Sequence, residues 1–334
     1  MPRLRRVSAA APGWHRRRRG GGFAYVDETG ARLPPEQVER IRRLAVPPAW
    51  QEVWICPYPN GHLQATGFDA AGRRQYLYHP QWRLLRDKLK FDRVAAAASR
   101  LPRARRRVGA DLGSSGMPLE RAAALAVRLL DLGYFRIGND YYADANGSFG
   151  LTTLERSHVR RHGNQLVFRF IGKSGIEHLV MIDDPDAMAA LRVMRDRRDG
   201  GNRLLAYRTA TGWADLTSSA VNSYLSELFE GEFTAKDFRT WHATVIAAES
   251  IALNPEPGST ATARKRVVKQ AVADVAGYLG NTPAIAKASY IDPRVLDRYE
   301  SGDTIADVAR RSFRSPARRQ AALEAAVLDL LNEA

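Results

Sequence analysis

The fold is decided by the stretch EVWICPYPNGHLQATGFDAAGRRQYLYH, residues 52–79. Apolar and polar residues alternate along it with a period of two, and Gly61 and Gly72 mark turns between the runs. The pattern predicts strands, and Phe23–Val26 reads in the same way. One helix, stopped before Pro47-Pro48, is predicted beside them. A small antiparallel β-rich domain therefore covers residues 23–90, with strands at Phe23–Val26, Glu52–Cys56, His62–Phe68 and Arg74–His79 and a helix at Gln37–Leu44.

Beyond residue 90 the periodicity is helical. Leu119–Leu132 follows Pro118 and ends at Gly133, as helix-terminus chemistry expects. One β-hairpin interrupts the helices, with Lys173 at its tip. The predicted class is α+β, with a larger, mainly α domain over residues 91–334. Its hairpin strands are Leu166–Ile171 and Ile176–Ile182, and its further helices are Ala187–Arg198, Ser218–Phe229, Trp241–Leu253, Thr262–Leu279 and Arg318–Leu331.

The charge of the chain indicates a polyanionic partner. The formal net charge is +15 and the pI is about 10.3. Through Lys90 there are 17 basic and 7 acidic residues, which places +10 of that charge in the first quarter. Residues 1–22 hold seven arginines and no acid, so we expect a basic, disordered tail there. The arginine-rich stretch 100–107 is expected to be a solvated or phosphate-facing loop.

Composition excludes several classes of protein. With 45% hydrophobic and 26% charged residues, the chain is not globally disordered. Its apolar runs fall short of the ~20 residues that a membrane span needs. A single cysteine, Cys56, cannot form an internal disulfide, which favours a reducing compartment. We expect a cytoplasmic protein that does not bind a membrane.

Two motifs that suggest a bound group are rejected. Gly172-Lys173-Ser174 is similar to the end of a phosphate-binding loop, but Val167 stands where that loop requires glycine. His158 and His162 are four residues apart, yet the segment runs into Gly163-Asn164, which favours a surface turn over a metal site. We therefore predict neither a metal nor a nucleotide cofactor.

Three separated polar residues follow helix or turn signals. Arg136 comes directly after the helix stop at Gly133, and Arg239 opens a helix. Thr282-Pro283 is typical of a helix start, which places Tyr290 about two turns later. Each residue taken alone is more typical of an ion pair or of packing than of catalysis.

Taken together with the hairpin lysine, these segments resemble the type IB DNA topoisomerases in order and spacing, particularly the small poxvirus and bacterial enzymes. The resemblance extends to the β-rich domain and covers most of residues 23–310. It implies a monomeric, nucleoid-associated isomerase that relaxes supercoiled duplex DNA without ATP, metal or cofactor. The matching N-terminal segments are Val46–Trp50, Trp54-Ile55, Gly61–Gly67 and Arg73–Tyr78.

The resemblance implies roles for the separated residues. Tyr290 matches the nucleophile that forms a 3′-phosphotyrosyl intermediate, and Arg136 and Arg239 match two phosphate-binding arginines. Arginine suits this role because its planar fork fits two phosphate oxygens and stays charged. A phosphodiester under attack gains negative charge, which fixed cations stabilise more than they stabilise the ground state.

Further catalytic positions follow from the same resemblance. Lys173 matches the hairpin lysine that protonates the 5′-oxygen as it leaves, and Lys236 matches a basic residue near the scissile phosphate. Asn281 departs from the family, which has histidine there as a donor to a non-bridging oxygen. An amide can also donate that bond but cannot titrate. We therefore expect activity to survive, with its rate and pH dependence altered.

DNA contacts are expected from the β-rich domain. The family positions that contact DNA are matched by Arg73, Arg74, Gln75, Tyr76 and Tyr78, with Tyr142 as a further phosphate contact. Glutamine can read a base edge in the major groove. The alternative for this segment is an ordinary alternating strand, in which the two β-strand tyrosines share a face.

Two other functions remain open from the residues alone. A tyrosine recombinase uses a similar catalytic set but generally carries a helical domain in front, where this chain predicts strands. A DNA-binding clamp that has lost catalysis is the second alternative, and Asn281 is the position that favours it.

Overall fold

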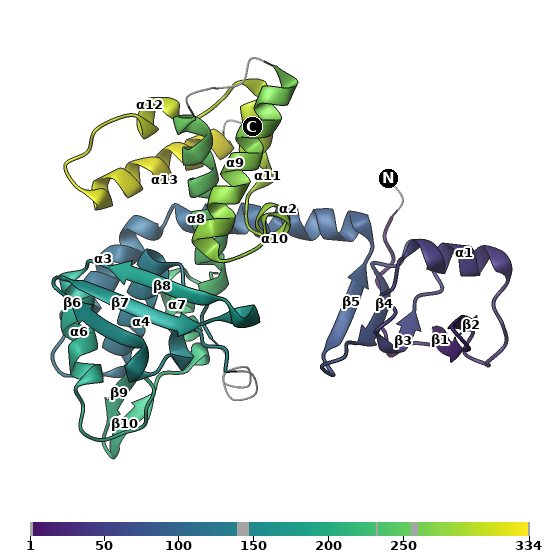
Figure 1. Ribbon diagram of the computed structural model, residues 1–334, viewed down its shortest axis with the longest axis horizontal. Coiled ribbons are helices and arrows are strands. Elements are labelled where there is room, and N and C mark those ends of the chain that lie inside the picture. Colours follow the sequence, from purple (N-terminus) through teal and green to yellow (C-terminus); the bar gives the residue numbers. More distant parts are fainter. Residues whose placement is uncertain (1–2, 139–146, 232, 255–259, 333–334) are drawn as a thin grey trace. The chain divides into compact units, whose positions relative to one another are not determined.

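The structure, a computed structural model, describes residues 3–138, 147–231, 233–254 and 260–332 (Figure 1). The chain divides into two compact units, Met1–Lys90 and Phe91–Ala334, which are described separately. A five-stranded antiparallel sheet comes first and a mainly helical region follows. The predicted α+β class is confirmed.

The first unit is built on the sheet, in the order β2-β1-β3-β4-β5. Helix α1 (Pro35–Arg43) buries Ile41 against Val53, Ile55 and Ala65, because its apolar residues fall on one side. This small core holds the strands together. They are β1 (Trp14–Arg19), β2 (Gly22–Val26), β3 (Gln51–Ile55), β4 (Leu63–Phe68) and β5 (Arg74–Tyr78).

The prediction of a disordered tail over residues 1–22 is wrong. The arginine run forms β1, which pairs with β2 and β3. Alternation explains this: Trp14 packs on the small core, and the Arg16 guanidinium donates to the carbonyls of Val46 (3.1 Å) and Pro47 (3.0 Å), while Arg17 faces solvent. Backbone pairing and these contacts outweigh the repulsion between neighbouring charges.

The second unit is mainly helical, and the division between the units falls within α2 (Pro80–Ala98). Its core is arranged around α4 (Leu119–Gly133) and α8 (Ala235–Leu253), which contact each other and most of the other helices. Both helices are buried along most of their length. The others are α3 (Leu101–Leu112), α6 (Pro185–Arg195), α7 (Ser218–Leu228), α9 (Ala261–Leu279), α10 (Pro283–Ser289), α11 (Pro293–Ser301), α12 (Ala306–Ala309) and α13 (Pro316–Asn332), with short 3₁₀ turns η1 (Leu151–Thr153), η2 (Arg156–His158) and η3 (Lys173–Gly175).

Two helices differ from the sequence prediction. The expected loop at residues 100–107 is part of α3, because Ala104 and Val108 lie at helical spacing and are buried. Helix α8 begins at Ala235 rather than Trp241, since the Asp237 carboxylate accepts from the backbone of Thr234 and caps the first turn. Arg239 consequently lies inside a buried helix instead of at its opening.

The predicted hairpin is present as β7 (Gln165–Ile171) and β8 (Glu177–Ile182). Strand β6 (Val159–His162) extends it to a three-stranded sheet that lies over α4 in Figure 1, with β8 in contact with that helix. A second hairpin, β9 (Ala206–Thr209) and β10 (Gly212–Asp215), was not predicted. None of the described helices is long and apolar enough to cross a membrane.

Candidate active site

The loop after α4 holds Arg136. Tyr134 takes a left-handed conformation (φ 53°), which turns the chain out of the helix, and Phe135 is buried beside it. The Arg136 carbonyl accepts from Leu151 N (2.8 Å), so the backbone is fixed on both sides. The guanidinium Nη2 then donates to Gly280 O (3.0 Å) and Asn281 Oδ1 (2.7 Å).

Arg239 projects from α8 to the same place. Its side chain is 4% exposed, and it donates through Nη1 to Tyr134 O and through Nη2 to Leu279 O (2.7 Å). Nε is buried without a hydrogen-bond partner. Backbone carbonyls from two other segments therefore fix the orientation of this guanidinium.

Tyr290 reaches the cluster from the end of α10. Gly280 ends α9 with φ 59°, a conformation that favours glycine, and the Thr282 hydroxyl accepts from Ile285 N to cap α10. Tyr290 then follows as the C-cap residue, half-buried. The Arg239 guanidinium carbon lies 5.5 Å from the centre of its ring.

Asn281 is oriented by the same turn. Its side-chain oxygen is taken by Arg136, so the amide nitrogen Nδ2 is left as the free end, buried and without a partner. An unpaired buried donor is costly unless a ligand accepts from it. The cluster thus combines two guanidinium groups with an amide donor.

The two arginines affect each other electrostatically. Burial lowers the pKa of Arg239 to about 10, and the charge of Arg136 acts in the same direction while Tyr290 opposes it. Burial also lowers the pKa of Arg136. Both groups stay protonated at neutral pH, and no carboxylate within the described ranges pairs with either of them. An anion beside them would offset this repulsion.

Lys173 and Lys236 are not joined to the cluster. Lys173 is exposed on the β7–β8 turn, where Ser174 and Gly175 are both left-handed. Lys236 is exposed in the first turn of α8. In the described part of the chain, no hydrogen bond links either lysine to Asn281 or Tyr290, the cluster residues that can accept one. The structure therefore brings together Arg136, Arg239, Asn281 and Tyr290.

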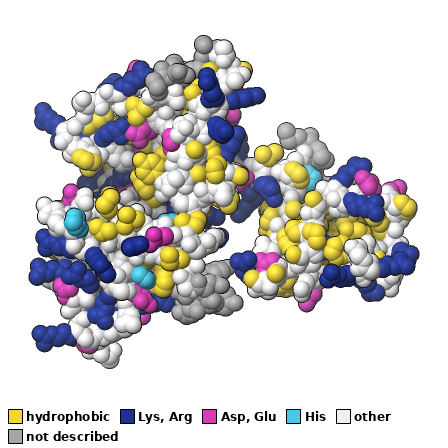
Figure 2. Space-filling view, viewed as in Figure 1, with side chains coloured by type: hydrophobic (Ala, Val, Ile, Leu, Met, Phe, Trp, Pro, Cys, Tyr) yellow, Lys and Arg dark blue, Asp and Glu magenta, His cyan; other side chains and the backbone are white. Residues whose placement is uncertain are grey.

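The predicted DNA-contacting residues lie on β5 and the turn before it. Tyr76 and Tyr78 are stacked at 6.1 Å on one exposed face, and the Arg74 guanidinium lies 5.8 Å from the Tyr76 ring. Gln75 alternates to the other side, where its amide donates to Asp69 (2.9 Å), a carboxylate that also binds Arg73 (2.8 Å). Tyr142 lies outside the described residues. Figure 2 shows more Lys and Arg than acidic side chains on the visible face.

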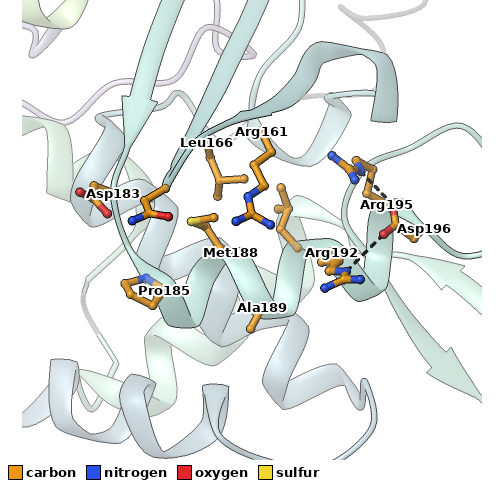
Figure 3. A pocket seen from close by; sticks show the side chains of 11 residues that line it. Arg161, Leu166, Asp183, Pro185, Met188, Ala189, Arg192, Arg195 and Asp196 are labelled. Carbon is orange, nitrogen blue, oxygen red and sulfur yellow. Dashed lines mark hydrogen bonds and ion pairs between the residues drawn. The ribbon is translucent and has the colours of Figure 1, made fainter.

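A large cavity lies elsewhere in the second unit, between the β6–β7 turn and α6 (Figure 3). It has a volume of about 560 Å³, and Figure 3 shows Arg161 reaching over an apolar floor that includes Met188. Asp196 pairs at its rim with Arg195 (2.9 Å) and Arg192 (3.7 Å). None of the lining residues is a hydroxyl, thiol, imidazole or amine, so this cavity offers no nucleophile or general base of those kinds.

A small cavity of about 30 Å³ lies at the arginine cluster and shows residues that the sequence analysis missed. Arg136, Arg239, Tyr134 and His178 all line it. Burial raises the pKa of Tyr134 to about 12. His178 lies in a β-prone run, and no local pattern separates it from an ordinary strand residue.

Comparison with known proteins identifies the family of the chain. A family model described as "Eukaryotic DNA topoisomerase I, catalytic core" matches residues 79–311, which is more than half of the chain. A second, "Bacterial DNA topoisomerase IB, N-terminal domain", matches residues 22–69. The two models together cover both units.

Two viral relatives are similar over most of the chain, and a yeast relative is similar over less than half of it. "DNA topoisomerase 1B" of Acanthamoeba polyphaga mimivirus is 27% identical over 299 residues, covering 86% of this chain and 88% of that protein. The vaccinia virus (strain Copenhagen) protein of the same name is 22% identical over 260 residues, covering 74% and 76%. "DNA topoisomerase 1" of Schizosaccharomyces pombe is 28% identical over 144 residues, covering 42% of this chain and 17% of that protein.

Proposed function

The chain belongs to the type IB DNA topoisomerases, with the small viral and bacterial enzymes, and it relaxes supercoiled duplex DNA; we propose that it does so through a transient 3′-phosphotyrosyl bond to Tyr290. In this proposal one strand is cut, the duplex beyond the cut rotates, and the strand is rejoined. We propose that it works as a monomer, because Arg136, Arg239, Asn281 and Tyr290 all come from one chain. Association with the nucleoid is proposed from the DNA substrate of the family.

The observation that carries this proposal is the pair of cations beside Tyr290. Arg239 is almost fully buried, Arg136 lies near enough to lower its pKa, and neither is paired with a carboxylate in the described ranges. Such an arrangement costs folding free energy unless an anion occupies it. A phosphodiester whose equatorial oxygens gain charge in the transition state fits the site, and the fixed guanidinium groups need no reorganisation to stabilise it.

The chemistry is a pair of in-line displacements. The Tyr290 oxygen forms a bond to phosphorus as the bond to the 5′-oxygen breaks, and its phenol proton passes to solvent. Lys173 gives a proton to the 5′-oxygen, so that no alkoxide is released. The phosphotyrosyl diester keeps the energy of the broken bond, and attack by the 5′-hydroxyl restores the strand without ATP.

Asn281 and Lys236 complete the set. Asn281 Nδ2, held in place by the bond from Arg136 to its oxygen, donates to a non-bridging phosphate oxygen. This replaces the histidine of the family pattern with a donor that cannot titrate. Lys236, exposed three residues before Arg239, supplies a further charge near the scissile phosphate.

Binding is assigned to the exposed face of β5. Arg74, Tyr76 and Tyr78 can meet a phosphate backbone as they stand, since they share one exposed face. Gln75 and Arg73 must exchange their bonds to Asp69 for bonds to DNA. Tyr142 is proposed as another phosphate contact.

The test is relaxation of supercoiled plasmid in EDTA without ATP. The parent, Tyr290→Phe and the control Tyr207→Phe, on β9 against the main core, are compared, and covalent complexes are trapped with detergent. We expect parent and control to relax the plasmid with protein on the 3′ end, and Tyr290→Phe to do neither. Equal relaxation by all three proteins would contradict the assignment of Tyr290.

Binding of plasmid without relaxation by any of the three proteins would favour the clamp that has lost catalysis. Asn281→His would then be the decisive variant, because it restores the histidine donor of the family pattern. The β-sheet front end disfavours the recombinase alternative, which generally carries a helical domain there.

A further inference from the structure

His178 occupies a junction between the lysine hairpin and the arginine cluster. It stands opposite Phe170 in the β7–β8 pairing, and the two rings stack at 5.2 Å with an interplanar angle of 16°. Phe170 in turn stacks on Phe135 at 5.8 Å. A column of three aromatic rings therefore runs from the residue before Arg136 to the hairpin.

The imidazole ring of His178 packs against the backbone of two glycines, Gly172 and Gly280. A Cβ added to Gly172 would lie 2.5 Å from His178 Cδ2, and one added to Gly280 would lie 2.6 Å from Cε1. Both backbones thus pack directly on the ring, where no other residue would fit without a shift. Gly172 precedes Lys173, and Gly280 precedes Asn281.

The surroundings of the ring are cationic. Burial lowers the pKa of His178, and the charges of Arg136 and Arg239 lower it further. The other titratable groups nearby are Tyr134 and Tyr278, which line the same cavity, and Lys173 on the adjoining turn. On the hairpin itself, Arg169 and Glu177 pair with each other at 2.6 Å. The imidazole is therefore neutral at physiological pH.

We propose that His178 is a positioning residue for the cleavage step, an uncharged ring that holds the Gly172–Lys173 turn at a fixed distance from the Gly280–Asn281 turn. This inference rests on the proposed function, because it concerns how Lys173 is delivered to the 5′-oxygen. Lys173 itself is exposed and makes no described contact with the arginines, so the root of its hairpin must set its reach. The His178 ring contacts both turns.

Changing the leaving group tests whether His178 positions Lys173 or only packs in the fold. A thiolate leaves without a proton, because thiols ionise near pH ~8.5, whereas an alkoxide needs a general acid. We would map the cleavage site of the parent on a duplex and place sulfur at the bridging 5′ position of that site. Covalent adduct formation is then measured in single turnover with the 5′-oxygen and the 5′-sulfur duplexes.

The variants are His178→Ala, which removes the ring, and His178→Phe, which keeps a ring that cannot protonate. Leu179→Ala, an exposed neighbour on β8, is the matched control. For His178→Ala we expect at least a tenfold loss of rate on the oxygen duplex, less than a threefold loss on the sulfur duplex, and unchanged DNA affinity. Equal losses on both duplexes, or no loss on either, would overturn the proposal.

The pH profile gives the second measurement. Burial and the charges of Arg136 and Arg239 hold the pKa of His178 below its ordinary value of about 6.5. The parent should therefore lose cleavage rate as the pH falls below that value, because a proton on His178 adds a third cation beside two arginines. His178→Phe should lack this acid loss, and an identical profile in both proteins would contradict the need for an uncharged ring. Should His178→Ala not fold, Gly172→Ala displaces the same contact and must show the same oxygen-to-sulfur difference.

The same experiment distinguishes failure of the proposed function from failure of the inference about His178. A parent protein that forms no adduct on either duplex contradicts the phosphotyrosyl mechanism and this inference with it. An active parent whose His178 variants behave like Leu179→Ala contradicts this inference alone.

Discussion

Arginine serves different purposes in the two units. In Met1–Lys90 several arginines stand exposed on strands: Arg17 faces solvent and Arg74 lies against the ring of Tyr76. In Phe91–Ala334, Arg239 is buried and fixed by two backbone carbonyls. Exposed cations bind phosphate through charge that salt screens, whereas buried, fixed cations stabilise a transition state. We therefore propose that the arginines of the first unit contribute to DNA affinity and that Arg239 contributes to the cleavage rate.

Buried arginines also differ within the second unit. Arg105 donates to both carboxylate oxygens of Asp131 (2.7 and 2.9 Å) and to Glu324 (2.6 and 2.8 Å), which joins α3, α4 and α13. Arg239 donates to two backbone carbonyls and lies beside the Tyr290 ring, and its Nε is buried without a hydrogen-bond partner. The first arrangement satisfies the charge within the fold, and the second leaves part of it for an anion.

The largest effect is expected on stability, from breaking the ion pair between Arg105 and Asp131. Asp131→Ala leaves Arg105 with one carboxylate and removes the partner at 3.2 Å from His242, so the free energy of unfolding should fall by about 3–5 kcal/mol. Urea unfolding checks this. Asp196→Ala, which breaks exposed pairs with Arg192 and Arg195, should cost less than about 1 kcal/mol. Equal losses would contradict the difference between the two networks.

The same variant has a predicted pH dependence. Burial by itself would raise the pKa of Asp131, but hydrogen bonds from Arg105 and His242 outweigh it and hold that pKa well below its ordinary value. The stabilisation is therefore complete above the unfolded pKa of about 4 and is lost as the pH falls further. Acidification should destabilise the parent more steeply than Asp131→Ala. Parallel unfolding curves below pH 4 would exclude this contribution.

Removing the Arg239 guanidinium should lower the rate of DNA cleavage rather than the stability of the fold. Arg239→Ala should slow single-turnover cleavage by about 10²–10³-fold with little change in DNA affinity. Arg197→Ala is the matched control, because Arg197 is equally buried and bound to the carbonyls of Met194 and Leu204 but lies in another part of the unit. It should lower stability and leave the cleavage rate of the folded protein unchanged. A slow Arg197→Ala enzyme would mean that buried arginines act here only through the fold.

Substitutions of Asn281 test the role of its amide nitrogen Nδ2 as a hydrogen-bond donor. Asn281→Ala removes Nδ2 and its bond to the phosphate, which should cost about 1.5–3 kcal/mol of transition-state stabilisation, or roughly 10–100-fold in cleavage rate. Asn281→His should keep activity and gain a dependence on pH near 6–7 that the parent lacks at this position. Unchanged rates in Asn281→Ala would remove this residue from the site.

Local signals in the sequence predicted the elements that carry the candidate site residues. Thr282-Pro283 predicted the start of α10 and hence the place of Tyr290, and the glycines around Lys173 predicted the hairpin. The grouping of Arg136 with Arg239 came from the family resemblance, since the two residues lie about a hundred positions apart. Local pattern alone could not have joined them.

Long-range contacts account for what was missed. The segment 14–19, with its arginine run, reads as disordered until the distant strand β3 pairs with Trp14 and His15. The sequence predicts Arg105 in a loop, whereas in the structure it forms ion pairs with Asp131 and Glu324 on two other helices. His178 is notable only because Gly172 and Gly280 fold against it. In each case the deciding partner is distant in sequence.

The smallest predicted effect returns to the exposed arginines of the first unit. Arg74→Gln should lower the slope of log affinity against log salt by about 0.9, the value for one phosphate contact. Arg73→Gln should change it less, because Arg73 is already paired with Asp69 at 2.8 Å and must break that pair to meet a phosphate. Binding of a labelled duplex across a salt series measures both. Cleavage at saturating protein should be unaffected in either variant, and a slowed cleavage step would place these arginines among the groups that set rate.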